Sequence, residues 1–110
     1  MRRPRTLVSH GDLHMRHVLV DPDGRCTGII DWGDVSAGDP SADLSIAYGS
    51  FVGPAREAFL DAYGPVDGLT ELRARVIATF LAAALLGHAA AKGWDGLRDE
   101  SLRTFERVVA

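Results

Sequence analysis

The chain has 110 residues, a formal net charge of −3 and a hydrophobic content of 46%. This length supports one modest core, so we expect a single domain over residues 1–110. The charge balance gives no reason to expect a nucleic-acid partner, and Pro4 interrupts the only basic run, which consists of Arg2, Arg3 and Arg5.

Cysteine content and hydropathy indicate a cytoplasmic protein. The single cysteine, Cys26, has no partner for an intrachain disulfide, which suits a reducing compartment. Residues 1–5 lack the apolar stretch of a signal peptide. The longest nearly apolar run, residues 76–91, has sixteen residues, fewer than the ~20 that span a bilayer. We therefore expect a core helix there and no membrane partner.

The first part of the chain predicts short strands. Residues 6–9 fit one strand. Residues 18–20 and 27–30 are rich in β-branched side chains and are joined by Asp21-Pro22-Asp23-Gly24, a sequence typical of a tight turn. These two segments therefore predict a β-hairpin.

The rest of the chain predicts helices. Asp39-Pro40-Ser41 is typical of a helix start, with Asp39 as the capping residue, and the helix is expected to reach about Tyr48. A second helix is expected from Pro54 to about Tyr63, where Gly64-Pro65 ends it.

A long helix is predicted from about Leu69 to Lys92, and a last one from about Leu97 to Val109. One face of the long helix carries apolar residues at three- and four-residue steps, and we expect that face to enter the core. Its members are Leu69, Leu72, Val76, Phe80, Leu81, Ala84, Leu85 and His88. The predicted class is α+β, with a chemistry-bearing part over residues 7–43 and a helical scaffold over residues 39–110.

The polar motifs stand at the ends of the predicted strands. His10-Gly11-Asp12-Leu13-His14 follows the first strand, and Ile30-Asp31-Trp32 follows the hairpin. A hairpin returns Asp31 towards the loop that carries Asp12, and His17 follows Asp12 by five positions. This order of parts is that of the protein-kinase template for phosphoryl transfer.

The segment that holds these motifs is acidic. Between residues 9 and 43 the only basic side chains are those of Arg16 and Arg25, whereas the acidic residues are Asp12, Asp21, Asp23, Asp31, Asp34, Asp39 and Asp43. Carboxylates brought together in this way repel one another unless a cation lies between them. The pattern is typical of a metal–phosphate site, although Asp21 and Asp23 read as turn residues.

With Gly38-Asp39-Pro40 and Asp43-Leu44 added, the motifs resemble the aminoglycoside phosphotransferase and choline kinase-like family over roughly residues 7–50. The resemblance implies a protein-kinase-like C-terminal lobe that transfers the γ-phosphate of ATP or GTP, with Mg²⁺ or Mn²⁺, to a hydroxyl of a small molecule such as an aminoglycoside or a similar alcohol. The sequence has no Gly-rich phosphate loop and no strand lysine. We therefore expect a fragment that self-associates or lacks its N-terminal lobe, and no nucleotide-binding residue is assigned.

The resemblance also implies roles for single residues. Asp12 would be the catalytic carboxylate that orients the attacking hydroxyl, and Asp31 a metal ligand. His17 stands where the family usually has Asn, and its imidazole either binds a metal, with a preference for manganese, zinc or iron over magnesium, or hydrogen-bonds a phosphate or Asp31. As alternatives, Asp12 caps a turn and Asp31 a strand end.

Five further residues are expected to support the site without touching substrate. His10 and Asp43 would hold the catalytic loop, the latter from the helix below, and His14 would brace the same loop. Asp39 would start a helix, and Asp34 is either a support for the site or a loop acid.

Two other functions remain open. His10-x-Asp12 with a distant histidine is the ligand pattern of an iron site in a metal-dependent hydrolase or oxygenase, but the helices after residue 43 do not suit the many-stranded folds of such enzymes. The other alternative is a non-catalytic remnant of a kinase lobe that acts as a binding module.

Overall fold

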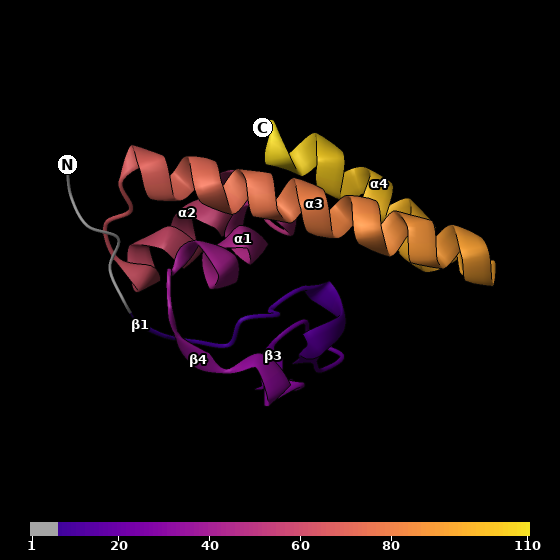
Figure 1. Ribbon diagram of the computed structural model, residues 1–110, viewed down its shortest axis with the longest axis horizontal. Coiled ribbons are helices and arrows are strands. Elements are labelled where there is room, and N and C mark those ends of the chain that lie inside the picture. The colour runs from indigo at the N-terminus through magenta and orange to yellow at the C-terminus, as the bar shows by residue number, and fades with distance from the viewer. Residues whose placement is uncertain (1–6) are drawn as a thin grey trace.

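The computed structural model describes residues 7–110, so Thr6 and the basic run at residues 2–5 lie outside the described residues. Within this range, two small sheets lie on one side of the molecule and four α-helices lie on the other (Figure 1). This arrangement confirms the predicted α+β class, the hairpin and the helical second part of the chain.

The hairpin consists of β2 (Val18–Val20) and β3 (Cys26–Ile29), which pair antiparallel with Val18 opposite Ile29. Its turn is organised by Asp21, whose Oδ1 accepts the backbone N–H groups of Asp23 and Arg25, each at 2.9 Å. Such local side-chain bonds are the reason that aspartate favours turns. The hairpin therefore follows from its own turn sequence.

The second sheet pairs β1 (Leu7–Ser9) with β4 (Ser36–Gly38), antiparallel and with Val8 opposite Ala37. The strand β4 was not predicted, because Ser-Ala-Gly has no β-branched or aromatic residue. Pairing with β1 forms it, which is a tertiary effect. Two short 3₁₀ helices, η1 (Met15–His17) and η2 (Trp32–Asp34), lie between the strands.

The helices are α1 (Ser41–Gly49), α2 (Gly53–Tyr63), α3 (Gly68–Lys92) and α4 (Asp95–Val108). The helix α1 is buried from Leu44 to Gly49, and it packs on both α3 and α4. Its residues Leu44, Ala47 and Tyr48 form the core cluster together with Ala74 of α3.

The face of α3 that enters the core differs from the predicted one. Phe80 is 73% exposed and Val76 59% exposed, and the buried residues of α3 are Ala74, Ala78, Ala82 and Ala89. Small side chains let the helix backbones approach closely. At Gly49 of α1, an added Cβ would lie 3.4 Å from the Cβ of Ala78. A bulky residue on this stripe would push α1 and α3 apart.

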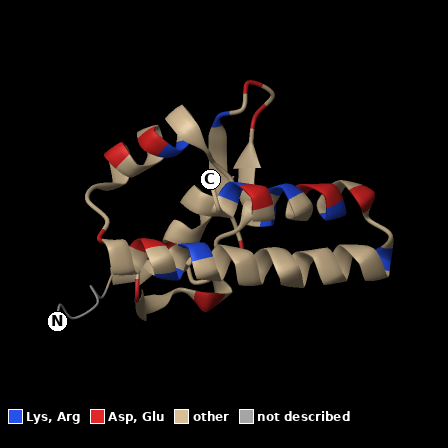
Figure 2. Cartoon of the chain, turned by 90° about the horizontal axis from the view of Figure 1, so that it is seen from above, with Lys and Arg blue, Asp and Glu red and all other residues tan. Residues whose placement is uncertain are grey.

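Among the described residues, one helix, α3, is long and apolar enough to cross a membrane by length and composition. It has 25 residues, more than the sixteen-residue run considered from sequence, and no charged side chain lies between Arg75 and Lys92 (Figure 2). The core helix of a soluble protein meets the same two criteria. In this molecule α3 packs on α1 and α4.

Candidate active site

His10 anchors the loop that follows β1. The side chain is buried, with 3% of the residue exposed. Its Nδ1 accepts the backbone N–H of Asp12 at 3.1 Å, so its Nε2 carries the proton and donates to the carbonyl oxygen of Ile30 at 2.7 Å. Because both ring nitrogens are occupied, His10 has no free nitrogen for a metal, and the iron-site pattern that would use it is not formed.

Asp43 holds the same loop from the first turn of α1. Its Oδ2 accepts the N–H of His10 at 2.7 Å, and its Oδ1 accepts the N–H of Gly11 at 3.0 Å. Bonds to an ionised acceptor are stronger than neutral ones. A single carboxylate thus fastens two successive backbone amides of the loop to the helical part of the chain.

Gly11 brings the loop that carries Asp12 against the turn that carries Asp34. Its φ is +91°, and a Cβ built on it would lie 2.6 Å from the backbone oxygen of Asp34. No L side chain fits there without a shift of the backbone. The loop with Asp12 and the turn with Asp34 are therefore in close backbone contact. Within the described part of the chain, no hydrogen bond or ion pair joins the Asp34 carboxylate to the other site residues.

Asp12 lies beside two histidines whose rings are close together. Its carboxylate oxygens lie 3.7 Å from Nε2 of His14 and 3.8 Å from Nδ1 of His17, and the side chain is 38% exposed. The two histidine rings lie 3.9 Å apart between centroids. Burial, together with the charge of His17, lowers the pKa of His14, although Asp12 opposes this. The carboxylate of Asp12 remains accessible to a small molecule.

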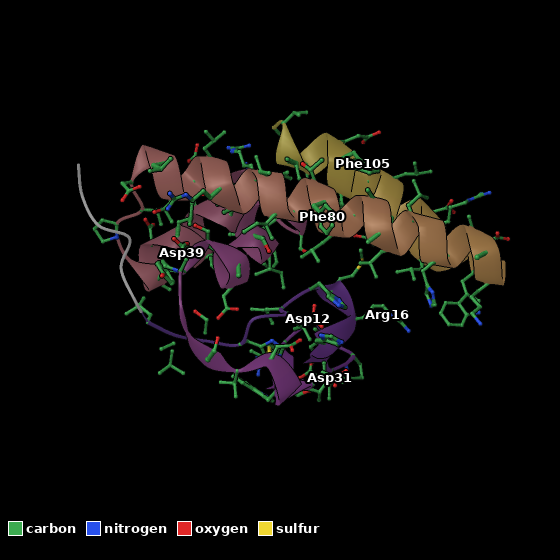
Figure 3. All side chains as sticks on the ribbon, in the orientation of Figure 1. Asp12, Arg16, Asp31, Asp39, Phe80 and Phe105 are labelled. Atoms are coloured by element: carbon green, nitrogen blue, oxygen red, sulfur yellow. The ribbon has the colours of Figure 1, made fainter. Side chains whose placement is uncertain are left out.

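His17 joins Asp12 to Asp31. Its Nδ1 lies 2.8 Å from the backbone oxygen of Asp12, and its Nε2 lies 3.1 Å from Oδ2 of Asp31. In Figure 3 the labelled Asp12 and Asp31 both lie in the strand-bearing part of the molecule, below the helices. Two carboxylates far apart in the sequence are thus brought to the opposite nitrogens of one ring.

Asp31 has an uncommon backbone conformation. It lies in the left-handed region with φ 64° and ψ 58°, and no other non-glycine residue of the described chain has a positive φ. Aspartate tolerates this region better than most residues, and residues held there are concentrated at functional sites. Its carboxylate is 70% exposed, apart from the contact with His17.

Asp39 does not join this group. Its Oδ1 accepts the N–H of Ser41, the first residue of α1, at 2.7 Å, and its Oδ2 pairs with Arg73 at 3.2 Å. The hydrogen bond from Ser41 holds the pKa of Asp39 below its usual value. Figure 3 places Asp39 beside the helices, away from Asp12 and Asp31.

Two contacts near the site had no sequence signal. The guanidinium of Arg16 lies 5.4 Å from the ring centroid of Trp94, a cation–π distance that ties η1 to the turn between α3 and α4. Trp32 is 49% exposed; its ring lies 4.5 Å from that of His10, and its Nε1 donates to the oxygen of Ile29. The contacts of Arg16 with Trp94 and of Trp32 with His10 join chain segments that meet only in the folded molecule.

The donor atoms suit a divalent cation. Among the described residues, Asp12, His14 and His17 each offer a ligand atom, all within 4.8 Å of one another. The pair of His17 and Asp31 offers a second grouping that shares the same ring. Mixed imidazole and carboxylate donors bind divalent ions of the first transition row, and carboxylates alone bind Mg²⁺.

Comparison with known proteins relates the chain to a protein family and to a bacterial protein. A family model described as "Phosphotransferase enzyme family" matches residues 1–98. A segment of 54 residues is 41% identical to "Uncharacterized protein YcbJ" of Bacillus subtilis (strain 168). That alignment covers 49% of the chain but 17% of YcbJ, so the chain spans a small part of the length of this relative.

Proposed function

The chain belongs to the phosphotransferase enzyme family, as its sequence motifs predicted, and we propose that it carries the catalytic half of a small-molecule kinase. The reaction proposed is transfer of the γ-phosphoryl group of ATP or GTP to a hydroxyl of a small molecule. The observation that carries the proposal is that His17 contacts both Asp12 and Asp31. This contact gives the acidic motifs a common centre.

Asp12 is the proposed catalytic carboxylate. The hydroxyl oxygen of the acceptor bonds to the γ-phosphorus while the bond from that phosphorus to the β–γ bridging oxygen breaks, and the hydroxyl proton passes to Asp12. The nucleoside diphosphate leaves. Phosphoryl transfer depends mainly on alignment and charge neutralisation. The bonds from Asp43 to the loop, at 2.7 and 3.0 Å, supply that alignment on the protein side.

Asp31 and His17 are the residues proposed to hold a divalent cation, Mg²⁺ or Mn²⁺. Such an ion neutralises charge on the nucleotide phosphates when it is bound. The carboxylate of Asp31 is exposed, and Nε2 of His17 faces it, so the donor set fits a cation. His10, His14 and Asp43 are proposed to position the loop.

The nucleotide is proposed to bind between this chain and a lobe that its 110 residues do not contain. Their sequence has no Gly-rich loop or strand lysine, and the 54-residue match covers 17% of YcbJ. The exposed apolar residues of α3, among them Val76 and Phe80, would be covered by that lobe or by a second copy of the chain. Light scattering of the isolated chain tests this: we expect small oligomers, and a clean monomer at high micromolar concentration would contradict self-association.

Incubation of the protein with γ-labelled ATP or GTP and a panel of small alcohols tests the function. We expect label in at least one acceptor when a nucleotide lobe is present, and very low turnover from the 110-residue chain alone. Kinase-like turnover by the isolated chain, on the order of 1 s⁻¹ or more, would contradict the need for a second lobe. Nucleotide binding with no labelled acceptor in any form of the protein would favour the binding-module alternative.

A further inference from the structure

Arg16, in η1 beside the catalytic loop, is a cation without an acidic partner. Within the part of the chain that the structure describes, no ion pair joins it to a carboxylate, and the residue is exposed. Five other arginines do pair with an aspartate or a glutamate: Arg73, Arg75, Arg98, Arg103 and Arg107. The positive charge of Arg16 is therefore available to a ligand.

The ring of Trp94 holds this guanidinium in place. The central carbon of the guanidinium lies 5.4 Å from the centroid of the ring, which His88 in turn meets edge-on at 5.2 Å. A guanidinium has five N–H donors, and a contact with the face of an aromatic ring uses none of them. Among the described residues, no hydrogen bond uses a side-chain N–H of Arg16 either. The donors are thus held near one position and remain free.

Arg16 lies close to the proposed catalytic carboxylate. Its backbone N–H donates to Nδ1 of His14 at 3.3 Å, and Nε2 of the same ring lies 3.7 Å from Oδ1 of Asp12. One imidazole ring therefore separates the backbone of Arg16 from the Asp12 carboxylate. In Figure 3 the labelled Arg16 lies below α3, in the same strand-bearing part of the molecule as Asp12.

The two carboxylate oxygens of Asp12 face different histidines, and this separates two roles. Oδ2 faces His17, whose other nitrogen contacts Asp31, and Oδ1 faces His14, which leads to Arg16. In phosphoryl transfer the attacking and leaving oxygens lie roughly in line, on opposite sides of the phosphorus. With the cation and the nucleotide phosphates on the His17 side, the acceptor belongs on the side of His14 and Arg16.

The surface beside Arg16 is apolar. Met15 of η1 and Leu81 and Leu85 of α3 are among the residues that line an apolar cavity between the loop and the helices. His88 follows Leu85 by three positions, so it lies on the same face of α3, next to Trp94. The ring of Trp94 is 44% exposed. This surface suits an aliphatic or aromatic group better than a chain of amines.

We propose that Arg16 and Trp94 bind the acceptor, and that the acceptor is a small hydroxy compound with an anionic group, a carboxylate or a phosphate. The inference rests on the proposed function and names its acceptor class. The planar donors of Arg16 bind the anion, and the ring of Trp94 packs against the body of the molecule. A polycation such as an aminoglycoside is disfavoured, because Arg16 repels it.

The experiment measures ligand binding by the 110-residue chain. Proton–nitrogen NMR follows the indole N–H of Trp94 and the side-chain N–H of Arg16 while each probe is added. The anionic probes are phenyllactate and glycerol phosphate, their neutral counterparts are phenyllactamide and glycerol, and the polycation is kanamycin. Magnesium ADP, added separately, shows whether the nucleotide uses the same arginine.

The test variant is Arg16→Gln, and Arg25→Gln is its matched control. Arg25 is also exposed and also has no ion pair among the described residues, but it lies at the hairpin, so its loss removes the same charge from another place. Circular dichroism checks that both variants are folded. If Arg16→Gln does not fold, the shift of the Arg16 signal in the wild-type chain and the ratio of affinities there decide the question.

We expect the wild-type chain to bind at least one anion at least fivefold more tightly than its neutral counterpart, and more tightly than kanamycin. Arg16→Gln is expected to reduce that ratio to less than twofold, and Arg25→Gln to leave it unchanged within twofold. The anion that binds more tightly identifies a carboxylate or a phosphate as the group that Arg16 recognises.

Three results would overturn the inference. The first is equal affinity for each anion and its neutral counterpart, or no shift of the Arg16 and Trp94 signals with either anion. The second is an equal loss in Arg25→Gln, because the effect would then be one of net charge. The third is a shift of the Arg16 signal with magnesium ADP and with neither anion, which would place the nucleotide there.

These outcomes are separable from the proposed function. An acid that binds at Arg16 but is never phosphorylated, even when the chain is joined to a nucleotide lobe, contradicts the function alone. Phosphoryl transfer to a neutral or cationic acceptor that Arg16→Gln does not change contradicts this inference alone.

Discussion

Nε2 of His10 lies 2.7 Å from the carbonyl oxygen of Ile30, the residue directly before Asp31. The other nitrogen of the same ring accepts the N–H of Asp12. One buried side chain thus connects the backbone at both carboxylates of the proposed site.

Replacement of His10 by alanine is expected to destabilise the chain by about 2–4 kcal/mol, because a buried side chain is removed and the N–H of Asp12 and the oxygen of Ile30 each lose a partner. Urea unfolding measures this change. His88 is exposed and contacts Trp94 edge-on, so His88→Ala is the control, expected to cost less than about 1 kcal/mol. Equal losses in the two variants would contradict the anchoring role of His10.

Gly11 and Gly24 form a matched pair for the contact between the two loops. Both have positive φ, but a Cβ at Gly11 meets the Asp34 oxygen at 2.6 Å, and one at Gly24 meets nothing within 4 Å. Gly24→Ala is expected to cost about 1 kcal/mol of backbone strain. Gly11→Ala is expected to cost at least about 1 kcal/mol more, because the backbone at Asp34 must move. Thermal unfolding compares the two, and a Gly11→Ala chain no less stable than Gly24→Ala would show that the contact is not tight.

Arg56 fastens the C-terminus to α1. Its buried guanidinium donates to backbone carbonyl oxygens of Ala47, Tyr48, Phe51, Arg107 and Ala110. Arg56→Lys keeps the charge but not the planar arrangement of donors, so we expect a loss of about 3 kcal/mol or more in urea unfolding. Arg103, whose side chain is 56% exposed, provides the control. Arg103→Lys is expected to stay within about 0.5 kcal/mol of the parent chain, and a similarly small effect at Arg56 would contradict this account.

Local chemistry explains which parts of the fold were predictable. The hairpin and the start of α1 depend on aspartates that bond to amides a few residues away, Asp21 and Asp39, so a short stretch of sequence determines each of them. The strand β4 and the buried stripe of α3 depend on distant partners. Both faces of α3 carry apolar residues at helical spacing, and the prediction chose the face with the larger side chains. In the structure the buried face carries alanines, and one of them, Ala78, lies close to Gly49 of α1.

The same distinction holds at the site. A hairpin returns Asp31 towards Asp12, so their proximity followed from topology. The pairing of His17 Nδ1 with a backbone oxygen and of Nε2 with Asp31 has no local signal, because it depends on how two loops meet. The bonds from Asp43 to the amides of His10 and Gly11 likewise require the packing of the loop on α1.

Asp39 is expected to make stability depend on pH at the acidic end. The bond from Ser41 lowers its folded pKa, so its contribution is fully present above the ordinary aspartate pKa of about 3.9 and is lost as the pH falls through the lower folded value. Melting temperatures measured from pH 6 downwards are expected to fall less steeply below about pH 4 in Asp39→Asn than in the wild-type chain. Asp61→Asn, an exposed change in α2, is the control. If the melting temperatures of the wild-type chain and of Asp39→Asn fall equally steeply at acidic pH, the prediction is wrong.

Turnover of Asp12→Asn and Asp31→Asn, in a protein that joins this chain to a nucleotide lobe, tests the central proposal most directly. We expect Asp12→Asn to lower kcat by a factor of about 100 or more, with nucleotide affinity within threefold of the parent, because its carboxylate acts on the acceptor hydroxyl. Asp31→Asn is expected to weaken metal-dependent nucleotide binding as well. A kcat for Asp12→Asn within twofold of the parent would contradict the assignment of Asp12 as the catalytic carboxylate.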